Sequence, residues 1–122
     1  MRNFRNLDIW KQGIELVKLI YGLSELLPSN EKFGLGSQIT RAAVSVPSNI
    51  AEGASRNSDV EFERFLEIAL GSLFEIETQL IIIKELNLVE IDLSELFDIV
   101  SKQGKMINGL ITTIKKAKGQ KP

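Results

Sequence analysis

The sequence predicts an all-α protein, an up-down-up-down antiparallel four-helix bundle. Apolar residues recur three and four positions apart through most of the chain, strand signals are nearly absent, and the segments between the periodic stretches are short. Short connections make successive helices antiparallel neighbours. At 122 residues, the chain is expected to form one domain over residues 1–122. We expect its helices at about residues 8–27, 30–54, 58–86 and 92–118.

The first predicted helix has Asp8 as its expected N-cap, and Pro28 follows its last residue. Two neighbouring apolar seams run along it and together cover a wider arc than a simple surface helix needs. One seam is Leu7, Trp10, Ile14, Val17 and Tyr21, and the other is Ile9, Gly13, Leu16, Ile20, Leu23 and Leu27.

The second predicted helix contains Pro47 at its centre and is expected to be kinked there. Proline inside a helix costs about 3 kcal/mol, so packing or binding around Pro47 should offset that loss. The predicted core face is Leu35, Ile39, Ala43, Val46 and Ile50. Roughly opposite lies a polar stripe, formed by Gln38, Arg41, Ser45, Ser48, Asn49, Glu52 and Arg56. Between these two faces lies a smooth flank of Val44, Pro47 and Ala51.

The third predicted helix begins with a capping box, in which Ser58 is followed three residues later by Glu61. Its core seam is Phe62, Leu66, Ala69, Leu73, Ile76, Leu80 and Ile83. The reverse side also carries apolar residues, Ile68 and Ile82, together with Gly71. A four-helix domain offers no fully surrounded position, so a helix that is apolar on both sides predicts a subunit interface.

The fourth predicted helix starts near Asp92, where Glu95 gives a second box-like start. Its apolar positions alternate in steps of four and three, the rhythm of a left-handed bundle seam. They are Leu93, Phe97, Val100, Gly104, Ile107, Ile111 and Ile114.

The composition argues against catalysis. The chain has no cysteine and no histidine, which excludes disulfides, thiolate nucleophiles, Cys/His zinc sites and histidine acid–base chemistry. Carboxylate metal sites in bundles generally need Glu-x-x-His pairs. Acidic pairs such as Glu61 and Glu63 point to different helix faces, and Gly34-Leu35-Gly36 lacks the remainder of a phosphate loop. We expect no enzyme, no cofactor, no metal and no small-molecule substrate.

The amino-terminal residues lack the pattern of a secretory signal, and the chain has no run of about 18 apolar residues that could span a bilayer. We therefore expect a cytoplasmic protein without membrane contact. The hydrophobic fraction of 43% and the charged fraction of 25% are ordinary for a globular chain.

The net charge of −1 is unevenly distributed. From residue 101 onward the chain has no acid and six lysines, Lys102, Lys105, Lys115, Lys116, Lys118 and Lys121. Residues 1–100 hold nine basic and sixteen acidic groups, a net −7. The lysines suit either a solvated end that complements the helix dipole or a site for phosphate or a partner.

The polar stripe allows two interpretations. It is either a solvated face, with Ser45 and Asn49 serving the carbonyls near Pro47, or an intersubunit network. In the network, Arg41 or Arg64 would pair with Glu52 or Glu75 of another copy. The predicted interface comprises Arg41, Val44, Ser45, Pro47, Ser48, Asn49, Ala51, Glu52, Arg64, Ile68, Gly71, Ser72, Glu75 and Ile82.

Three parts of the chain carry a family resemblance: Trp10, the stretch QITRAAVSVPSNIAEG at residues 38–53 with the following Arg56, and the stretch FERFLEIALGSLFE at residues 62–75. The chain resembles, over nearly its whole length, the bacterial four-helix bundle family named after open reading frames in the intervening sequences of 23S ribosomal RNA genes. This resemblance implies a ring-like homopentamer. It also implies kinship with the accessory protein of diversity-generating retroelements, a pentameric bundle that binds nucleic acid and a reverse transcriptase.

Together these observations predict a non-enzymatic homo-oligomer, a pentamer, that acts as a scaffold or adaptor contacting RNA or a protein partner. The alternative is a nucleic-acid-binding protein that uses Arg41, Arg56, Arg64, Lys115, Lys116 and Lys118. The retroelement accessory protein is markedly basic, whereas this chain is slightly acidic. Neutralising phosphate charge supplies much of nucleic-acid affinity, which favours the scaffold.

Overall fold

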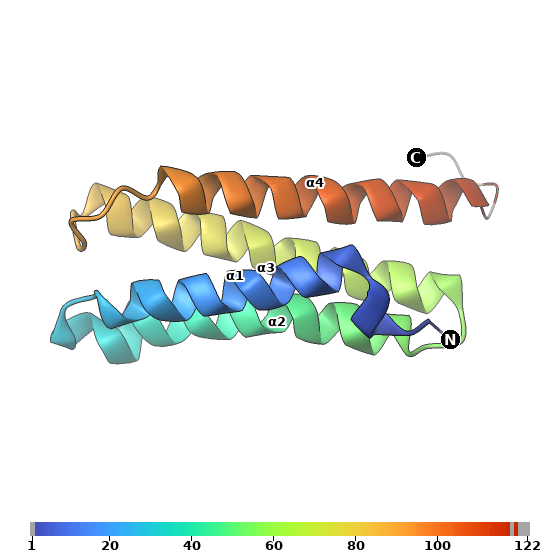
Figure 1. Ribbon diagram of the computed structural model, residues 1–122, viewed down its shortest axis with the longest axis horizontal. Helices are drawn as coiled ribbons and strands as arrows, with labels where there is room; N and C mark the ends of the chain where they lie inside the picture. Colours follow the sequence, from blue (N-terminus) through green and yellow to red (C-terminus); the bar gives the residue numbers. More distant parts are fainter. Residues whose placement is uncertain (1, 118, 120–122) are drawn as a thin grey trace.

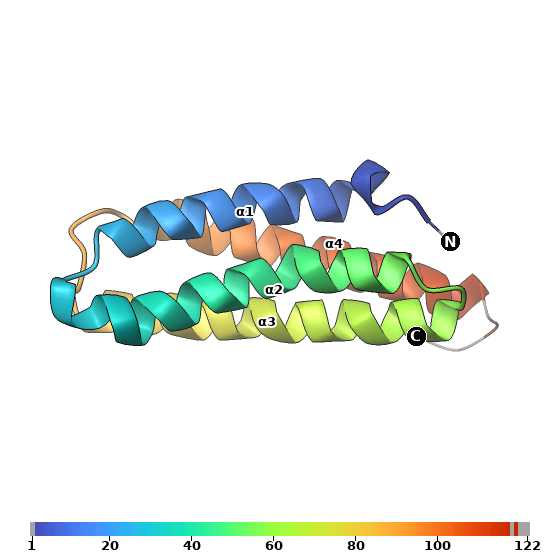
Figure 2. The same ribbon diagram turned by 90° about the horizontal axis from the view of Figure 1, so that it is seen from below.

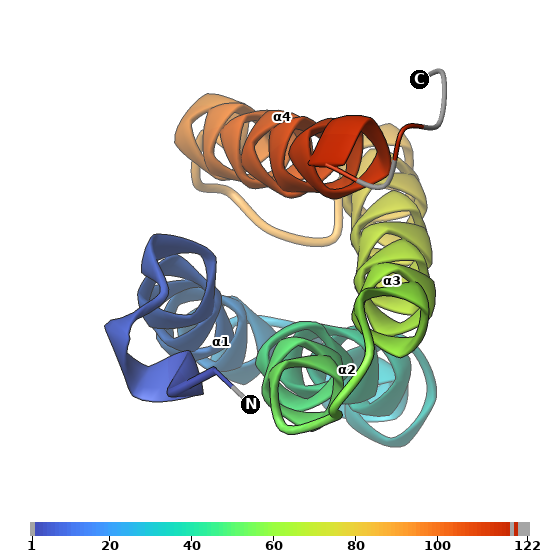
Figure 3. The same ribbon diagram turned by 90° about the vertical axis from the view of Figure 1, so that its right-hand side faces the viewer.

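The structure, a computed structural model, describes residues 2–117 and 119. These residues form four α-helices and no strand: α1 (Asp8–Glu25), α2 (Ser37–Ala54), α3 (Asp59–Glu85) and α4 (Ser94–Ala117). Successive helices run in opposite directions, as the short connections predict (Figure 1). Viewed end-on, α2 lies between α1 and α3, and α4 packs on α3 and also contacts α1 (Figure 3). The predicted four-helix bundle is confirmed.

The hydrophobic core follows the predicted seams. The inner seam of α1 is buried throughout, as is the seam of α3, because side chains at helical spacing fall on one face. In α2 the core face is buried from Ile39 to Ile50, while Leu35 is only half-buried in the turn before the helix. The outer seam of α1 is different: Ile14 and Tyr21 are exposed.

Two helix starts differ from those expected. Asp8 is not an N-cap, because the carbonyl of Leu7 accepts the first bonds, from the N–H groups of Trp10 and Lys11, which puts Asp8 inside the first turn. There its carboxylate faces the positive end of the helix dipole. The expected start of α2 near residue 30 is too early. Residues 29–36 wind first as a 3₁₀ turn (Ser29–Glu31) and then as a π-helical turn (Lys32–Gly36). Another 3₁₀ turn, Phe4–Asn6, precedes α1.

The predicted capping box of α3 is found in the structure, whereas Asp92, before α4, binds Ser94 rather than Glu95. The Ser58 hydroxyl accepts the N–H of Glu61 at 3.2 Å, so α3 is capped as predicted. Asp92 Oδ1 accepts both the N–H of Ser94, at 2.9 Å, and its hydroxyl, at 2.6 Å. Both bonds stabilise the carboxylate, the hydroxyl bond more than the N–H bond. They therefore hold the pKa of the Asp92 carboxyl below its usual value.

One buried polar contact joins α4 to α1. The fully buried Gln103 of α4 donates from Nε2 to the carbonyl oxygen of Ile9 in α1, at 2.8 Å. Its Oε1 has no hydrogen-bond partner among the described residues. A buried amide that loses its partner costs free energy. This bond therefore favours one position of α4 along α1.

Glycine allows α2 to approach α3 closely. A Cβ placed on Gly53 would lie 2.6 Å from the Cβ of Phe65 and 3.1 Å from the ring of Phe62, so only glycine fits. Gly109 of α4, by contrast, has open space where its Cβ would be.

We predict opposite effects of alanine at these two glycines. Gly53→Ala should destabilise the fold by about 1–3 kcal/mol, since α2 and α3 must separate to admit the methyl group. Gly109→Ala should stabilise it by about 0.5–1 kcal/mol through higher helix propensity. Urea unfolding followed by circular dichroism measures both. Equal effects of the two substitutions would contradict the close approach.

Candidate interaction surface on α2 and its neighbours

Pro47 lies within a continuous α2 that bends gently near its middle (Figure 2). It has no N–H for the carbonyl of Ala43, four residues back. Its ring is buried against α1, where a Cβ placed on Gly13 would lie 3.2 Å from the Cβ of Pro47. Close packing of α1 on Pro47 is therefore the contact that offsets the cost of the proline.

A chain of hydrogen bonds joins α2 to α3. Asn49 Nδ2 donates to the carbonyl and the hydroxyl of Ser45, at 2.8 and 2.9 Å. The hydroxyls of Ser45 and Ser72 lie 2.8 Å apart, and Ser72 donates to the carbonyl of Ile68 at 3.3 Å. Because Ser72 has a single proton, Ser45 is the donor in the pair. Asn49 thus donates to the carbonyl of Ser45. The carbonyl that lacks a donor because of Pro47 is that of Ala43, two residues earlier.

The end of α2 is held within the subunit. Arg56 donates to Glu52 at 2.8 Å and lies over the ring of Phe65, 5.3 Å from its centroid. Nearby, Arg2 pairs with Asp59. Glu52 therefore has a partner in its own chain, although the intersubunit network was expected to use it.

Three other charged residues of the predicted network stay exposed. Arg41, Arg64 and Glu75 form no ion pair with any residue that the structure describes. They remain the candidates for pairing between copies.

An apolar groove separates the outer sides of α1 and α2, and we call it the α1/α2 groove. Its volume is about 270 Å³. Its lining consists of Trp10, Ile14, Val17, Val44, Pro47, Ser48 and Ala51. The groove is the outer seam of α1 set against the smooth flank of α2, so the two sequence features meet here.

The outer side of α3 carries exposed apolar side chains, which we call the α3 ridge: Ile68, Phe74, Ile81 and Ile82. They are 44%, 60%, 47% and 38% exposed, respectively. A shallow pocket of about 360 Å³ lies beside the ridge, between α2 and α3. Its lining includes Gln38, Gly71, Glu75, and the buried Gln79, whose Oε1 has no partner among the described residues.

Most of the predicted interface residues reach the surface. Pro47 and Ser72 do not, because Pro47 packs on α1 and Ser72 bonds to α2 inside the subunit. Ser45, Asn49 and Ala51 are half-buried. The exposed members are Arg41, Val44, Ser48, Glu52, Arg64, Ile68, Gly71, Glu75 and Ile82.

The structure adds residues that were not assigned to the interface: Trp10 and Ile14 in the groove, and Phe74 and Ile81 on the ridge. The second apolar seam of α1 was the signal for the first pair. Phe74 and Ile81 directly precede Glu75 and Ile82, two residues of the predicted interface.

The predicted basic residues lie mostly toward one end of the bundle, where α2 ends, α3 begins and α4 ends (Figure 1). Arg56, Arg64, Lys115 and Lys116 lie there. Arg41 lies near the start of α2, toward the opposite end. The predicted Lys118 falls outside the described residues.

The helices that the structure describes include none that is long and apolar enough to cross a membrane. In the same part of the chain, no three acidic side chains gather as ligands for a metal ion.

These features define a small all-α bundle protein with exposed apolar surfaces on α1, α2 and α3. A sequence model of the 23S rRNA-intervening sequence protein family matches residues 5–109, and the chain therefore belongs to that family. No curated protein matches the chain.

We predict that adjacent residues of α2 separate folding from surface roles. Asn49→Ala should destabilise the fold by about 1–2 kcal/mol, because it removes both bonds to Ser45. Ser48→Ala, at an exposed position that lines the α1/α2 groove, should change stability by less than about 0.5 kcal/mol. Thermal unfolding compares the two, and a larger loss for Ser48→Ala would contradict this assignment.

Proposed function

We propose that this protein is a non-enzymatic, cytoplasmic scaffold or adaptor that works as a closed homo-oligomer, a pentamer. The observation that carries the proposal is that α3 has apolar side chains on two sides, one buried and one exposed. Leu66, Leu73 and Leu80 are buried in the core, while Ile68, Phe74 and Ile82 stand exposed on the outer side. An exposed apolar strip along one helix is the usual mark of an interaction site.

The form of the surfaces supports a ring. The α1/α2 groove is concave and apolar, whereas the apolar side chains of the α3 ridge stand exposed on a helix that does not line this groove. A contact between two different surfaces repeats from copy to copy, so it either closes into a ring or grows into a filament. We propose that the ridge of one copy fills the groove of the next. The count of five rests on the family resemblance.

The charges around these surfaces suit a polar rim. Arg41 and Arg64 lie beside the apolar residues of α2 and α3, and Glu75 lies on the ridge side of α3. Protein interfaces commonly surround an apolar centre with charged side chains that set the register of the contact. In the proposed ring, opposite charges from neighbouring copies meet at this rim.

Replacing a ridge residue by a charge tests the proposal. Ile68→Glu should dissociate the assembly, because a carboxylate would be buried at the contact without a partner, and helicity should be largely kept. Light scattering at micromolar concentration measures the mass, and circular dichroism the helix content.

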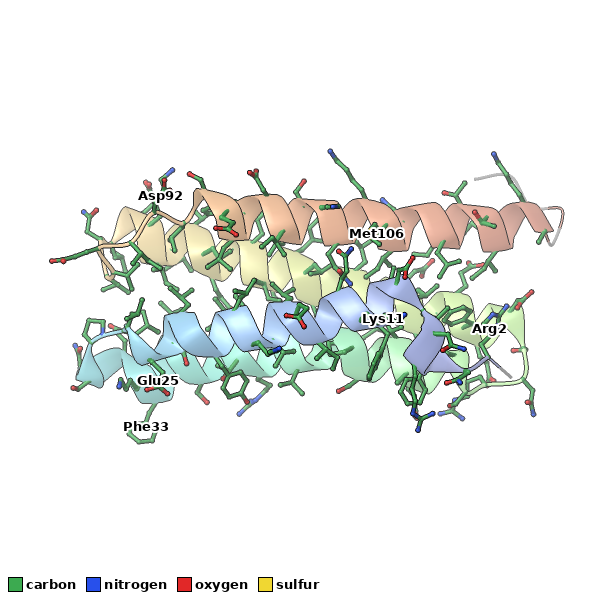
Figure 4. All side chains as sticks on the ribbon, in the orientation of Figure 1. Arg2, Lys11, Glu25, Phe33, Asp92 and Met106 are labelled. Carbon is green, nitrogen blue, oxygen red and sulfur yellow. The ribbon has the colours of Figure 1, made fainter. Side chains whose placement is uncertain are left out.

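Phe33→Glu is the matched control. Phe33 is 97% exposed, projects from the turn before α2 (Figure 4) and belongs to neither surface. This variant should keep the mass of the parent protein. A parent protein that is monomeric, or an Ile68→Glu variant that unfolds, would overturn the proposal.

Nucleic-acid binding is the second candidate function. It is favoured by Lys115 and Lys116 in the last turn of α4, with no acid from residue 99 onward. Because Arg56 is already bonded to Glu52, the lysines would carry most of the affinity. The affinity for a labelled RNA hairpin should then fall steeply as salt is raised. In a plot of the logarithm of the binding constant against the logarithm of the salt concentration, each phosphate contact should add about 0.9 to the steepness.

A protein truncated after Ile114 should lose part of that slope. A flat salt response in the full chain, or the same slope after truncation, would exclude this role and leave the scaffold.

A further inference from the structure

A third apolar surface lies where α1 meets the start of α4, away from the groove and ridge already described. We call it the α1/α4 groove. It has a volume of about 190 Å³. Its lining consists of Leu19, Leu23, Ile91, Asp92, Glu95, Leu96 and Ile99. Leu19 is 42% exposed and Ile91 is 48% exposed, so the apolar surface is open to solvent.

The apolar surface extends along α1 beyond the groove. Leu19, Gly22 and Leu26 follow one another at steps of three and four, and therefore share one side of the helix. Leu26 is 52% exposed. A Cβ placed on Gly22 would meet nothing within 4 Å, so another backbone can approach the helix there.

The charged side chains that line this groove are both acidic. Asp92 and Glu95 are the charged residues of the lining, and neither forms an ion pair with another described residue. The hydrogen bonds from Ser94 lower the pKa of the Asp92 carboxyl and so favour its charged form. A neighbouring pocket shares Ile91 and Asp92 with the groove and adds Glu90 and Lys84. The groove is thus apolar at its base and negative at its edge.

We propose that the α1/α4 groove docks a basic amphipathic helix of a protein partner. The apolar side chains of that helix would lie on Leu19 and Ile91, and its lysines or arginines would face Asp92 and Glu95. Helix-in-groove recognition uses this combination of an apolar stripe and flanking charge. The inference rests on the adaptor role proposed above and names the chemistry of the partner. It does not require the ring.

A second copy of the chain fits this groove poorly. Lys115 and Lys116 lie at the other end of the bundle from Asp92, which Figure 4 labels where α4 begins. A copy aligned in the same direction, as in the proposed ring, would keep these lysines at the other end of the bundle from Asp92 and Glu95. Nucleic acid is disfavoured because the edge of the groove repels phosphate.

Binding of synthetic helices tests the proposal. The probe is a fluorescein-labelled amphipathic peptide of leucine and lysine, compared with a scrambled peptide of the same composition and with one that has glutamate for lysine. We expect the amphipathic basic peptide alone to bind, with an affinity that falls as salt is raised. Amide shifts in NMR spectra should change at Leu19, Ile91 and Ile99.

The double variant Asp92→Asn/Glu95→Gln should weaken binding about tenfold. Asparagine keeps an oxygen for Ser94, so the start of α4 is retained. Leu19→Gln should also weaken binding about tenfold, through the lost apolar contact. The matched control is Glu61→Gln/Glu67→Gln on α3, which removes the same charge at the far end of the bundle and should leave the affinity unchanged.

Failure to bind the basic amphipathic peptide, or equal losses in the test and control variants, would overturn the docking proposal. Light scattering on each variant separates this result from the ring. A monomeric protein that still binds the peptide through Asp92 and Glu95 contradicts the ring alone, and an intact oligomer that ignores the peptide contradicts the docking alone.

Discussion

The structure depends on how closely α2 approaches the helices on both of its sides. On one side Pro47 packs closely on Gly13, where an added Cβ would lie 3.2 Å from the Cβ of Pro47. On the other side Gly53 lies against Phe65, and Ser45 bonds to Ser72 across a gap that only small residues permit. Small residues on two faces of one helix thus set the spacing of three helices, and α4 then covers the remaining core.

This close packing also shapes the outer surface. On the α2 side the α1/α2 groove is lined by short side chains such as Ser48 and Ala51, and on the α1 side by Trp10 and Ile14. Pro47, which brings α2 close to α1, is therefore also part of the α1/α2 groove. In the proposed ring, the exposed apolar side chains of the α3 ridge would fill the α1/α2 groove of the next copy.

The sequence predicted most of the fold and part of the site. Helical periodicity identified the core seams of α1 and α3, because the burial of a regular helix follows from local spacing. It could not predict the bond between Gln103 and Ile9, which joins residues 94 positions apart and depends on how the helices pack. For the same reason Ser72 was expected at an interface between copies, although it bonds to Ser45 inside the subunit. Residues 29–36 were misjudged because 3₁₀ and π turns carry no distinct period.

The distribution of charge separates the proposed roles of the surfaces. A net charge of −1 suggests no preferred partner, yet Asp92 and Glu95 border an apolar groove at one end, and Lys115 and Lys116 lie at the other. Contacts between copies through the α1/α2 groove and the α3 ridge would leave the α1/α4 groove free, since it lies on the opposite side of α1. An adaptor needs this independence, because a surface used for assembly cannot also receive a partner. In the proposed adaptor, the physical separation of the two surfaces on α1 would let one small bundle both assemble and bind a partner.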